Sequence, residues 1–291
     1  MVAKETEVDR IGVVGCGLMG SGIAEVAARA GADVVVIERS ADALAQGEAR
    51  IERSLTRAVS SGKLPEDEAN RARGNLTFGV DFELLAEREM VIEAVAEDED
   101  LKVEVFRTLD AVVTDPQAIL ATNTSSIPII KLAMVTKRPE QVIGMHFFNP
   151  VPVLKLVEVI SSLLTNAETT TRVREYASEA LGKRVITSKD RAGFVVNALL
   201  IPYLLSAVRM LESGFASAED IDTGMVVGCA HPLGPLALTD LIGLDTTLAV
   251  AESLYEEFKE PHLAPPPLLS RMTQAGLLGR KSGQGFYAYK A

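Results

Sequence analysis

The sequence has 291 residues, of which 47% are hydrophobic and 24% are charged. These values are typical of a globular protein of about two domains, and they exclude a disordered, collagen-like or disulfide-stabilised chain. The formal net charge of −11 argues against a general nucleic-acid or anionic-membrane surface, but it leaves a local basic patch open.

The first predicted unit lies between Arg10 and Ser40. An apolar strand at 11–14 is followed by the turn Gly15-Cys16-Gly17-Leu18-Met19-Gly20, an alanine-rich helix at 21–30 and a β-branched strand at 33–37. The spacing G-x-G-x-x-G between strand and helix, with Glu38 ending the second strand, is typical of a dinucleotide site. A glycine-rich structural turn is the alternative.

Helices and strands then alternate along the chain. The segment 41–73 predicts two helices interrupted at 60–65, which would form an arm. Strands are expected at 90–95, 118–121, 142–146 and 153–160, with helices at 101–112 and 127–134. This alternation predicts an α/β fold, a Rossmann-like doubly wound domain over residues 1–188. Strand signals are absent from Ala192 onward, so we expect an all-α domain over residues 189–291.

The cysteines and the apolar stretches bear on location. Cys16 and Cys229 both lie in apolar, glycine-rich surroundings, which predict small buried side chains in a reducing compartment. Residues 1–10 lack the apolar core of a signal peptide, so we expect a cytoplasmic protein. The stretch 192–208 is marginal for a membrane span because it contains Asn197 and Pro202, and a helix buried at an interface is expected instead.

The three histidines, His146, His231 and His262, lack the spacing of metal ligands, so no metal site is expected. His146 is the candidate for chemistry because it ends an apolar strand, where such folds bind ligands. Lys155 and Glu158 should project from opposite faces of the next strand. A buried Glu158 would need a partner, such as a histidine that takes up a proton. A core histidine and an ordinary salt bridge are the alternatives.

The polar run at 121–126, Ala-Thr-Asn-Thr-Ser-Ser, follows a short strand and precedes a helix. It predicts a helix N-cap turn, a polar rim of the cofactor site, or both.

Together these segments resemble the short-chain 3-hydroxyacyl-CoA dehydrogenase family, in particular the bacterial 3-hydroxybutyryl-CoA dehydrogenases, over essentially the whole chain. The HFFNP segment with a glutamate 12 residues after its histidine is the most diagnostic part. The matching stretches are GCGLMG at 15–20, EAVAEDEDLK at 93–102, ATNTSS at 121–126, GMHFFNPVPVLKLVEVI at 144–160, GFVVN at 193–197, HPLGPLALTDLIGLD at 231–245 and GRKSGQGFYAY at 279–289.

The resemblance implies a role for each matching residue. His146 would be the catalytic acid/base, Glu158 would orient it, and Ser125 and Asn197 would contact the C3 oxygen and the thioester of the substrate. The cofactor site would contain Gly15, Gly17, Leu18, Met19, Gly20, Glu38, Ala94, Glu97, Lys102, Ser125 and Asn149. Hydride would pass from C3 of a (3S)-3-hydroxyacyl thioester to NAD while His146 takes the hydroxyl proton. The chain departs from the family at Ala198, where arginine is usual.

The part of the predicted arm between residues 50 and 63 is basic, with a net charge of +3. Arg50, Arg53, Arg57 and Lys63 stand against Glu52, and the three arginines share one helix face. The phosphates of coenzyme A would explain this stripe. The resemblance adds a serine, so Ser54, Arg57 and Lys63 are the candidate acyl-CoA contacts. A solvated basic face is the alternative.

The sequence also bears on the choice between NAD and NADP and on the oligomeric state. Glu38 favours NAD because it would repel a 2′-phosphate, whereas Arg39 beside it leaves NADP open. The apolar stretches 193–210 and 232–244 and the resemblance predict a homodimer formed through the C-terminal domain. Alternative functions are a dehydrogenase of a free hydroxy acid, of the L-gulonate 3-dehydrogenase type, and a non-catalytic dinucleotide-binding protein.

Overall fold

The computed structural model describes residues 8–289. The chain divides into two compact units, Met1–Arg191 and Ala192–Ala291. The division lies slightly beyond the predicted boundary at 188/189, because the last strand of the first unit runs through Lys189.

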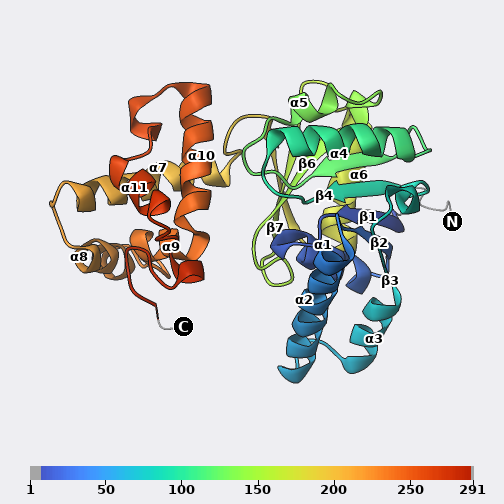
Figure 1. The fold of residues 1–291 in the computed structure, drawn as a ribbon, viewed down its shortest axis with the longest axis horizontal. Coiled ribbons are helices and arrows are strands. Elements are labelled where there is room, and N and C mark those ends of the chain that lie inside the picture. Colours follow the sequence, from blue (N-terminus) through green and yellow to red (C-terminus); the bar gives the residue numbers. More distant parts are fainter. Residues whose placement is uncertain (1–7, 290–291) are drawn as a thin grey trace. The chain divides into compact units, whose positions relative to one another are not determined.

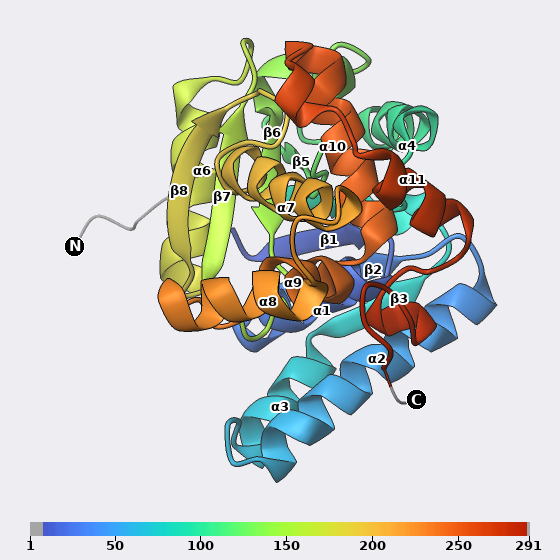
Figure 2. The same cartoon turned by 90° about the vertical axis from the view of Figure 1, so that its left-hand side faces the viewer.

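Within the described residues the first unit contains one eight-stranded sheet, in the order β3-β2-β1-β4-β5-β6-β7-β8 (Figures 1 and 2). The strands are β1 (Arg10–Val14), β2 (Asp33–Ile37), β3 (Leu76–Gly79), β4 (Met90–Glu93), β5 (Ile119–Thr122), β6 (Val142–Phe147), β7 (Leu156–Ser161) and β8 (Arg184–Lys189). Neighbouring strands from β3 to β6 are parallel, whereas β7 is antiparallel to β6 and parallel to β8. The order from β3 to β6 is that of a Rossmann-type doubly wound sheet.

Helices cover both faces of this sheet. The helices of the first unit are α1 (Leu18–Arg29), α2 (Ala41–Ser60), α3 (Glu66–Gly74), α4 (Glu99–Val112), α5 (Ile129–Ala133) and α6 (Ala167–Glu175). One core joins α1 and the end of α6 to alternate strand residues such as Val13, Val36 and Met145. The residues between them face the opposite side, where a Cβ at Gly144 would meet Ile129 of α5.

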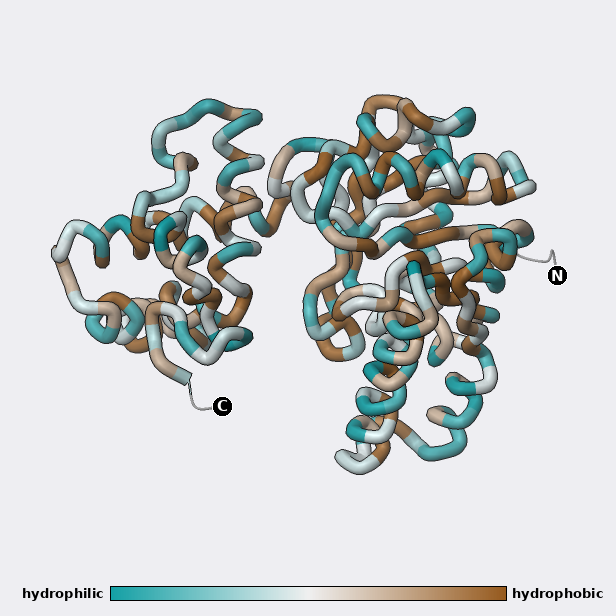
Figure 3. The backbone as a smooth tube through the Cα atoms, viewed as in Figure 1, coloured by the Kyte–Doolittle hydropathy of each residue, from teal (hydrophilic) through white to brown (hydrophobic). Residues whose placement is uncertain are grey.

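The central strands are apolar along their whole length because both faces are covered. Figure 3 shows this as hydrophobic segments through the sheet, in contrast to the more hydrophilic pair α2 and α3. The arm predicted at 41–73 is confirmed as α2 and α3, with the turn at 61–65 between them.

The largest shift in a predicted strand boundary is at β7, and two strands were not predicted. β7 begins at Leu156 rather than Val153, because Val153 N and Leu154 N donate to the Pro150 carbonyl in a turn. The strands β3 and β8 were not predicted. Both lie at edges of the sheet and contain no buried residue, so they lack the apolar run of a central strand.

The second unit is helical, as predicted. Its helices are α7 (Val196–Glu212), α8 (Ala218–Thr223), α9 (Pro235–Ile242), α10 (Leu244–Phe258) and α11 (Pro267–Gln274). They enclose a separate core that includes Leu204, Leu236 and Leu254. The apolar stretch at 192–208 falls largely in α7, and among residues 8–289 no helix is long and apolar enough to span a bilayer.

Candidate active site

The glycine turn joins β1 to α1 at the carboxyl edge of the sheet. Gly15 has a φ of 90°, and its N–H donates to the Ile37 carbonyl over 2.8 Å, which ties the turn to the end of β2. A side chain at Gly20 would overlap the carbonyl oxygen of Gly15, so glycine is required for α1 to begin this close to β1. A Cβ at Gly17 would instead meet no atom within 4 Å. Open space therefore lies in front of this part of the turn.

The start of α1 suits a phosphate. Gly17 is its N-cap residue, and no side chain in the described part of the structure caps the first N–H groups of the helix. Such N–H groups, together with the helix dipole, bind phosphate. Leu18 is exposed beside them, whereas Met19 packs against the core. The turn therefore fits the pyrophosphate of a dinucleotide.

A cavity of about 510 Å³ adjoins the turn. Its lining includes Cys16, Glu38, Arg39, Arg50 and Ala94. Glu38 accepts hydrogen bonds from Cys16 N over 2.8 Å and from Arg39 N over 3.0 Å. These two backbone donors hold the Glu38 carboxylate at the wall of the cavity, a position that suits an adenosine ribose.

The two cysteines differ in environment. Cys16 is buried beneath the turn, and burial together with the Glu38 carboxylate raises the pKa of its thiol to about 12, so the thiol is neutral. The prediction of a buried side chain is confirmed for Cys16. It is wrong for Cys229, which is exposed. Cys229 follows the π-helical segment Gly224–Gly228, in which no residue is buried, so its glycine-rich surroundings belong to a surface bend.

A buried polar network joins the ends of β4 and β5. Glu93 and Lys102 are almost fully buried and form an ion pair of 2.7 Å between Oε1 and Nζ. Glu93 also accepts from Thr122 Oγ1 over 2.7 Å and from Val95 N over 2.7 Å. Lys102 Nζ lies 3.3 Å from Glu97 Oε2. If either Glu93 or Lys102 moved away, the other would be left as a buried charge without a partner. This energetic cost holds both side chains in place.

Glu97 holds the turn that carries Ser125. Its Oε1 accepts from Thr124 Oγ1 over 2.6 Å, Ser125 N over 2.8 Å and Ser126 N over 3.0 Å. Burial alone would raise the pKa of Glu97, but Lys102 and these donors outweigh burial and hold the pKa below its ordinary value. The polar run at 121–126 is therefore a rigid rim at the carboxyl edge of the sheet.

His146 and Glu158 lie directly opposite each other in the antiparallel register of β6 and β7. Both are buried, and His146 Nδ1 is 2.7 Å from Glu158 Oε2. A neutral imidazole that donates its Nδ1–H to the carboxylate carries its lone pair on Nε2. Lys155 lies outside β7 and is exposed, so the buried member of the Lys155/Glu158 pair is the glutamate.

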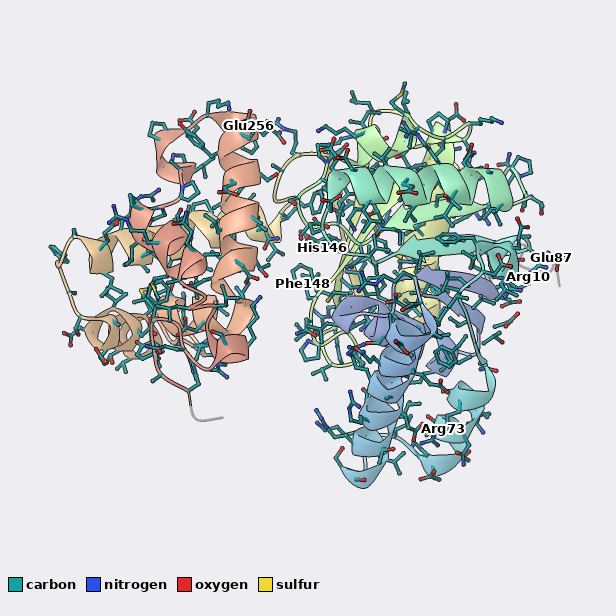
Figure 4. All side chains as sticks on the ribbon, in the orientation of Figure 1. Arg10, Arg73, Glu87, His146, Phe148 and Glu256 are labelled. Carbon is teal, nitrogen blue, oxygen red and sulfur yellow. The ribbon has the colours of Figure 1, made fainter. Side chains whose placement is uncertain are left out.

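Phe148 restrains the same imidazole. Its ring centroid is 4.6 Å from that of His146 and the two planes are inclined by 58°. Figure 4 labels both side chains at the edge of the first unit. The imidazole is thus held by a carboxylate at Nδ1 and by an aromatic ring.

The remaining predicted residues lie elsewhere. Asn149 is exposed after β6, and Asn197 lies on α7 in the second unit. Arg57 and Lys63 are exposed on the arm, whereas Ser54 is half-buried and its hydroxyl opposes the rise that burial causes in the pKa of Glu25 on α1.

Sequence reasoning missed two features of this site. Glu93 was not singled out, although it begins the matched stretch EAVAEDEDLK and an acid at the end of an apolar strand is itself a signal. Arg50 was grouped with the basic stripe of the arm, but its guanidinium reaches the Cys16 carbonyl. Among residues 8–289 no group of three or more His, Cys, Asp or Glu side chains could hold a metal ion.

A doubly wound sheet, a phosphate-binding turn and a titratable pair at the carboxyl edge define a dinucleotide-dependent oxidoreductase. The family model for the NAD binding domain of 3-hydroxyacyl-CoA dehydrogenase matches residues 10–191, and the model for the C-terminal domain of 3-hydroxyacyl-CoA dehydrogenase matches residues 193–289. The chain therefore belongs to the 3-hydroxyacyl-CoA dehydrogenase family.

Individual relatives agree with this assignment. The chain is 58% identical to a 3-hydroxybutyryl-CoA dehydrogenase of Mycobacterium tuberculosis, over 97% of this chain and 99% of the relative. It is 40% identical to the human mitochondrial hydroxyacyl-coenzyme A dehydrogenase, over 99% and 93%. The structure of an (S)-3-hydroxybutyryl-CoA dehydrogenase from Ralstonia eutropha superimposes with a TM-score of 0.93 at 45% identity, over 98% and 100%. The predicted family, fold class and NAD-binding assignment are confirmed.

Proposed function

We propose that this protein oxidises short-chain (3S)-3-hydroxyacyl-CoA, such as 3-hydroxybutyryl-CoA, to 3-oxoacyl-CoA with NAD, and that it catalyses the reverse reduction. The observation that carries the proposal is the buried pair of His146 and Glu158 at the carboxyl edge of a dinucleotide-binding sheet. The names of the relatives support the substrate class.

His146 moves the proton in the proposed mechanism. With its Nδ1–H directed at Glu158, the imidazole accepts the hydroxyl proton of the substrate at Nε2. The positive charge that develops on the ring is stabilised by Glu158, whose burial limits screening by water. Bound NAD supplies the chemistry of hydride acceptance from C3. In the reverse direction the imidazolium returns the proton to the C3 oxygen.

Ser125 and Asn197 are proposed to position the C3 oxygen and the thioester. The support for Ser125 is its place on the rim that Glu97 holds. Asn197 rests on the family resemblance, and it gives the second unit a role in substrate binding.

The arm is proposed to bind the phosphates of coenzyme A. Glu52, the one acidic residue between positions 50 and 63, is paired with Arg73 of α3, which Figure 4 labels, through bonds of 2.8 and 2.9 Å, and the hydrogen bonds from Arg73 lower the pKa of Glu52. The exposed Arg53, Arg57 and Lys63 therefore keep their positive charge uncompensated by Glu52. This local charge favours a polyanionic acyl carrier over a free hydroxy acid.

The decisive experiment compares acetoacetyl-CoA with free acetoacetate as oxidant of NADH and of NADPH. We expect rapid NADH consumption with the thioester only, and a lower kcat/KM for NADPH because Glu38 opposes a 2′-phosphate. Turnover of the free acid at a comparable kcat/KM would contradict the acyl-CoA assignment. No NADH consumption with either compound would contradict the catalytic assignment.

The arm has its own test. Arg57→Glu should raise the KM for acetoacetyl-CoA about tenfold and leave the Kd for NADH unchanged. Arg174→Glu, at an exposed position on α6, is the matched control and should change neither. An unchanged KM in Arg57→Glu would remove the arm from the acyl-CoA site.

The second unit is also proposed to form the homodimer contact. Leu199, Phe215 and Val227 are 74%, 79% and 77% exposed, which is unusual for large apolar side chains and typical of an interface. The cytoplasmic location stays a prediction from the sequence.

A further inference from the structure

Arg50 is the one arginine of the predicted basic stripe with a hydrogen bond to the glycine turn. Its Nη1 donates to the carbonyl oxygen of Cys16 over 2.7 Å, and Glu38 accepts from the N–H of the same residue. The backbone of Cys16 is therefore held by the Glu38 carboxylate at its N–H and by the Arg50 guanidinium at its carbonyl. Both side chains line the 510 Å³ cavity.

The face of α2 explains how Arg50 reaches the cavity. Ala43, Gln46 and Arg50 all line it, and their spacing places them on one side of the helix. Gly47 permits this approach, because a Cβ there would lie 2.5 Å from Cys16 Sγ. The first half of α2 is thus a wall of the dinucleotide cavity.

The same helix face then continues past the cavity. Arg53 and Arg57 follow Arg50 at intervals of three and four residues, but both are exposed and neither lines the cavity. The stripe that the sequence presented as one feature is therefore divided in the structure. Arg50 belongs to the cavity, and the other two arginines belong to the arm.

The guanidinium has donors left for a ligand. Arginine presents five N–H groups in a rigid plane, and among the described residues the Cys16 carbonyl accepts one hydrogen bond from Arg50. The cavity lies between the phosphate-binding turn and Glu38, so its occupant there is the adenosine half of the dinucleotide. Ribose oxygens, adenine nitrogens and phosphate oxygens are all acceptors for an arginine.

We infer that Arg50 is a cofactor-binding residue that donates hydrogen bonds to the adenosine half of NAD. It does not belong to the arginines of the arm that are proposed to bind acyl-CoA. The inference rests on the NAD-binding assignment of the first unit and does not need the proposed substrate. One face of α2 accordingly serves two ligands, the dinucleotide at its first half and the acyl carrier beyond it.

The test is a titration of NADH into the full-length protein, followed by nicotinamide fluorescence with no thioester present. Arg50→Met keeps the length of the side chain and removes its charge and donors, and it should raise the Kd for NADH about tenfold. Arg50→Lys, which keeps the charge, should fall between Arg50→Met and the unchanged protein. Arg53→Met, one helical turn away and exposed, is the matched control and should leave the Kd unchanged.

Two further readouts separate binding from support of the turn. The Kd of 5′-AMP, measured by its displacement of NADH, should rise in Arg50→Met, whereas the Kd for reduced nicotinamide mononucleotide, which lacks the adenosine half, should stay constant. Equal losses for both compounds would show that Arg50 only supports the glycine turn and would overturn the inference. An unchanged Kd for NADH would overturn it as well. These binding measurements contain no thioester, so they test the role of Arg50 even if the proposed substrate is wrong.

Discussion

The imidazole of His146 is restrained on two sides, by Glu158 at Nδ1 and by the ring of Phe148. A general base must present a defined nitrogen to its proton donor, so fixing Nδ1 also decides that Nε2 does the chemistry. The sequence indicated His146 from the end of an apolar strand and indicated by alternation that Lys155 or Glu158 faces the cover of the sheet, and the family resemblance selected Glu158. It contained no pattern that identifies Phe148 as a neighbour, since Phe148 lies beyond the strand end and its ring direction depends on the local turn.

His146→Ala should lower kcat for acetoacetyl-CoA reduction by roughly 10²- to 10⁴-fold, because the positioned proton donor is lost. The Kd for NADH should stay unchanged, since His146 does not line the adenosine cavity. Steady-state kinetics and fluorescence titration measure the two quantities. A variant that retains full kcat would remove His146 from the mechanism.

The ionisation of a second residue, Glu97, makes the stability of the folded protein depend on pH. Because its pKa is lower in the folded protein than its ordinary value of 4.5, folding favours the charged carboxylate. That stabilisation is fully present above the pKa of the unfolded chain and is lost as pH falls through the lower folded-state pKa.

Glu97→Gln should therefore have a lower Tm than the unchanged protein at about pH 7, and the difference should narrow as pH falls below 4.5 and through the folded-state pKa of Glu97. Thermal unfolding across this pH range provides the measurement. Glu168→Gln, at an exposed position on α6, is the control and should show a small difference at every pH. A Tm difference for Glu97→Gln that does not change with pH over the acid range below 4.5 would contradict the argument.

At the scale of elements, strands covered on both faces were predictable and edge strands were not. β1, β2, β4, β5 and β6 are continuous apolar runs because helices cover both faces. β3 and β8 have no buried residue, so their sequences carry no such run. The acidic run at 97–100 shows that local sequence reveals a cap but not a distant partner. Asp98 is the N-cap of α4, whereas Glu97 accepts a hydrogen bond from Ser125 N, 28 residues along the chain.

The turn before α1 makes a matched pair of predictions at this scale. Gly17 has an ordinary φ of −67° and open space where a Cβ would stand, so Gly17→Ala should keep the Tm and weaken NADH binding about tenfold by occupying the phosphate space. Gly20→Ala should instead lower the Tm, since its methyl group overlaps the Gly15 carbonyl. Thermal melts and NADH titrations distinguish the two, and the idea fails if Gly17→Ala binds NADH as well as the unchanged protein.

At the scale of the whole molecule, the chain consists of two units with separate cores. The change from alternating strands and helices to helices alone was visible in the sequence. The sequence did not show at which residue the first unit ends, because β8 is an edge strand and lacks the apolar run of a central strand. The contribution of Asn197 from the second unit likewise rests on resemblance, since no local pattern connects it to His146.

Light scattering should give a mass of about 62 kDa, twice the 31.1 kDa of the chain. Val227→Glu in the second unit should shift the protein toward the monomer, because a charge would be buried at the contact. Leu163→Glu, at a leucine of the first unit that is 92% exposed, is the control and should leave the mass unchanged. A monomeric mass for the unchanged protein would refute the homodimer.

The direct opposition of His146 and Glu158 across β6 and β7 also bears on how the gene can tolerate insertions and deletions. The pairing depends on register and not on the number of residues between the two strands, so length changes in the exposed part of the connection at 153–155 leave the two side chains opposed. Deletion of one residue inside β7, between its start and Glu158, would turn the glutamate to the other face of the sheet and bring an apolar neighbour against the imidazole. Viable length variants should therefore gather in the connection and be absent from the strands.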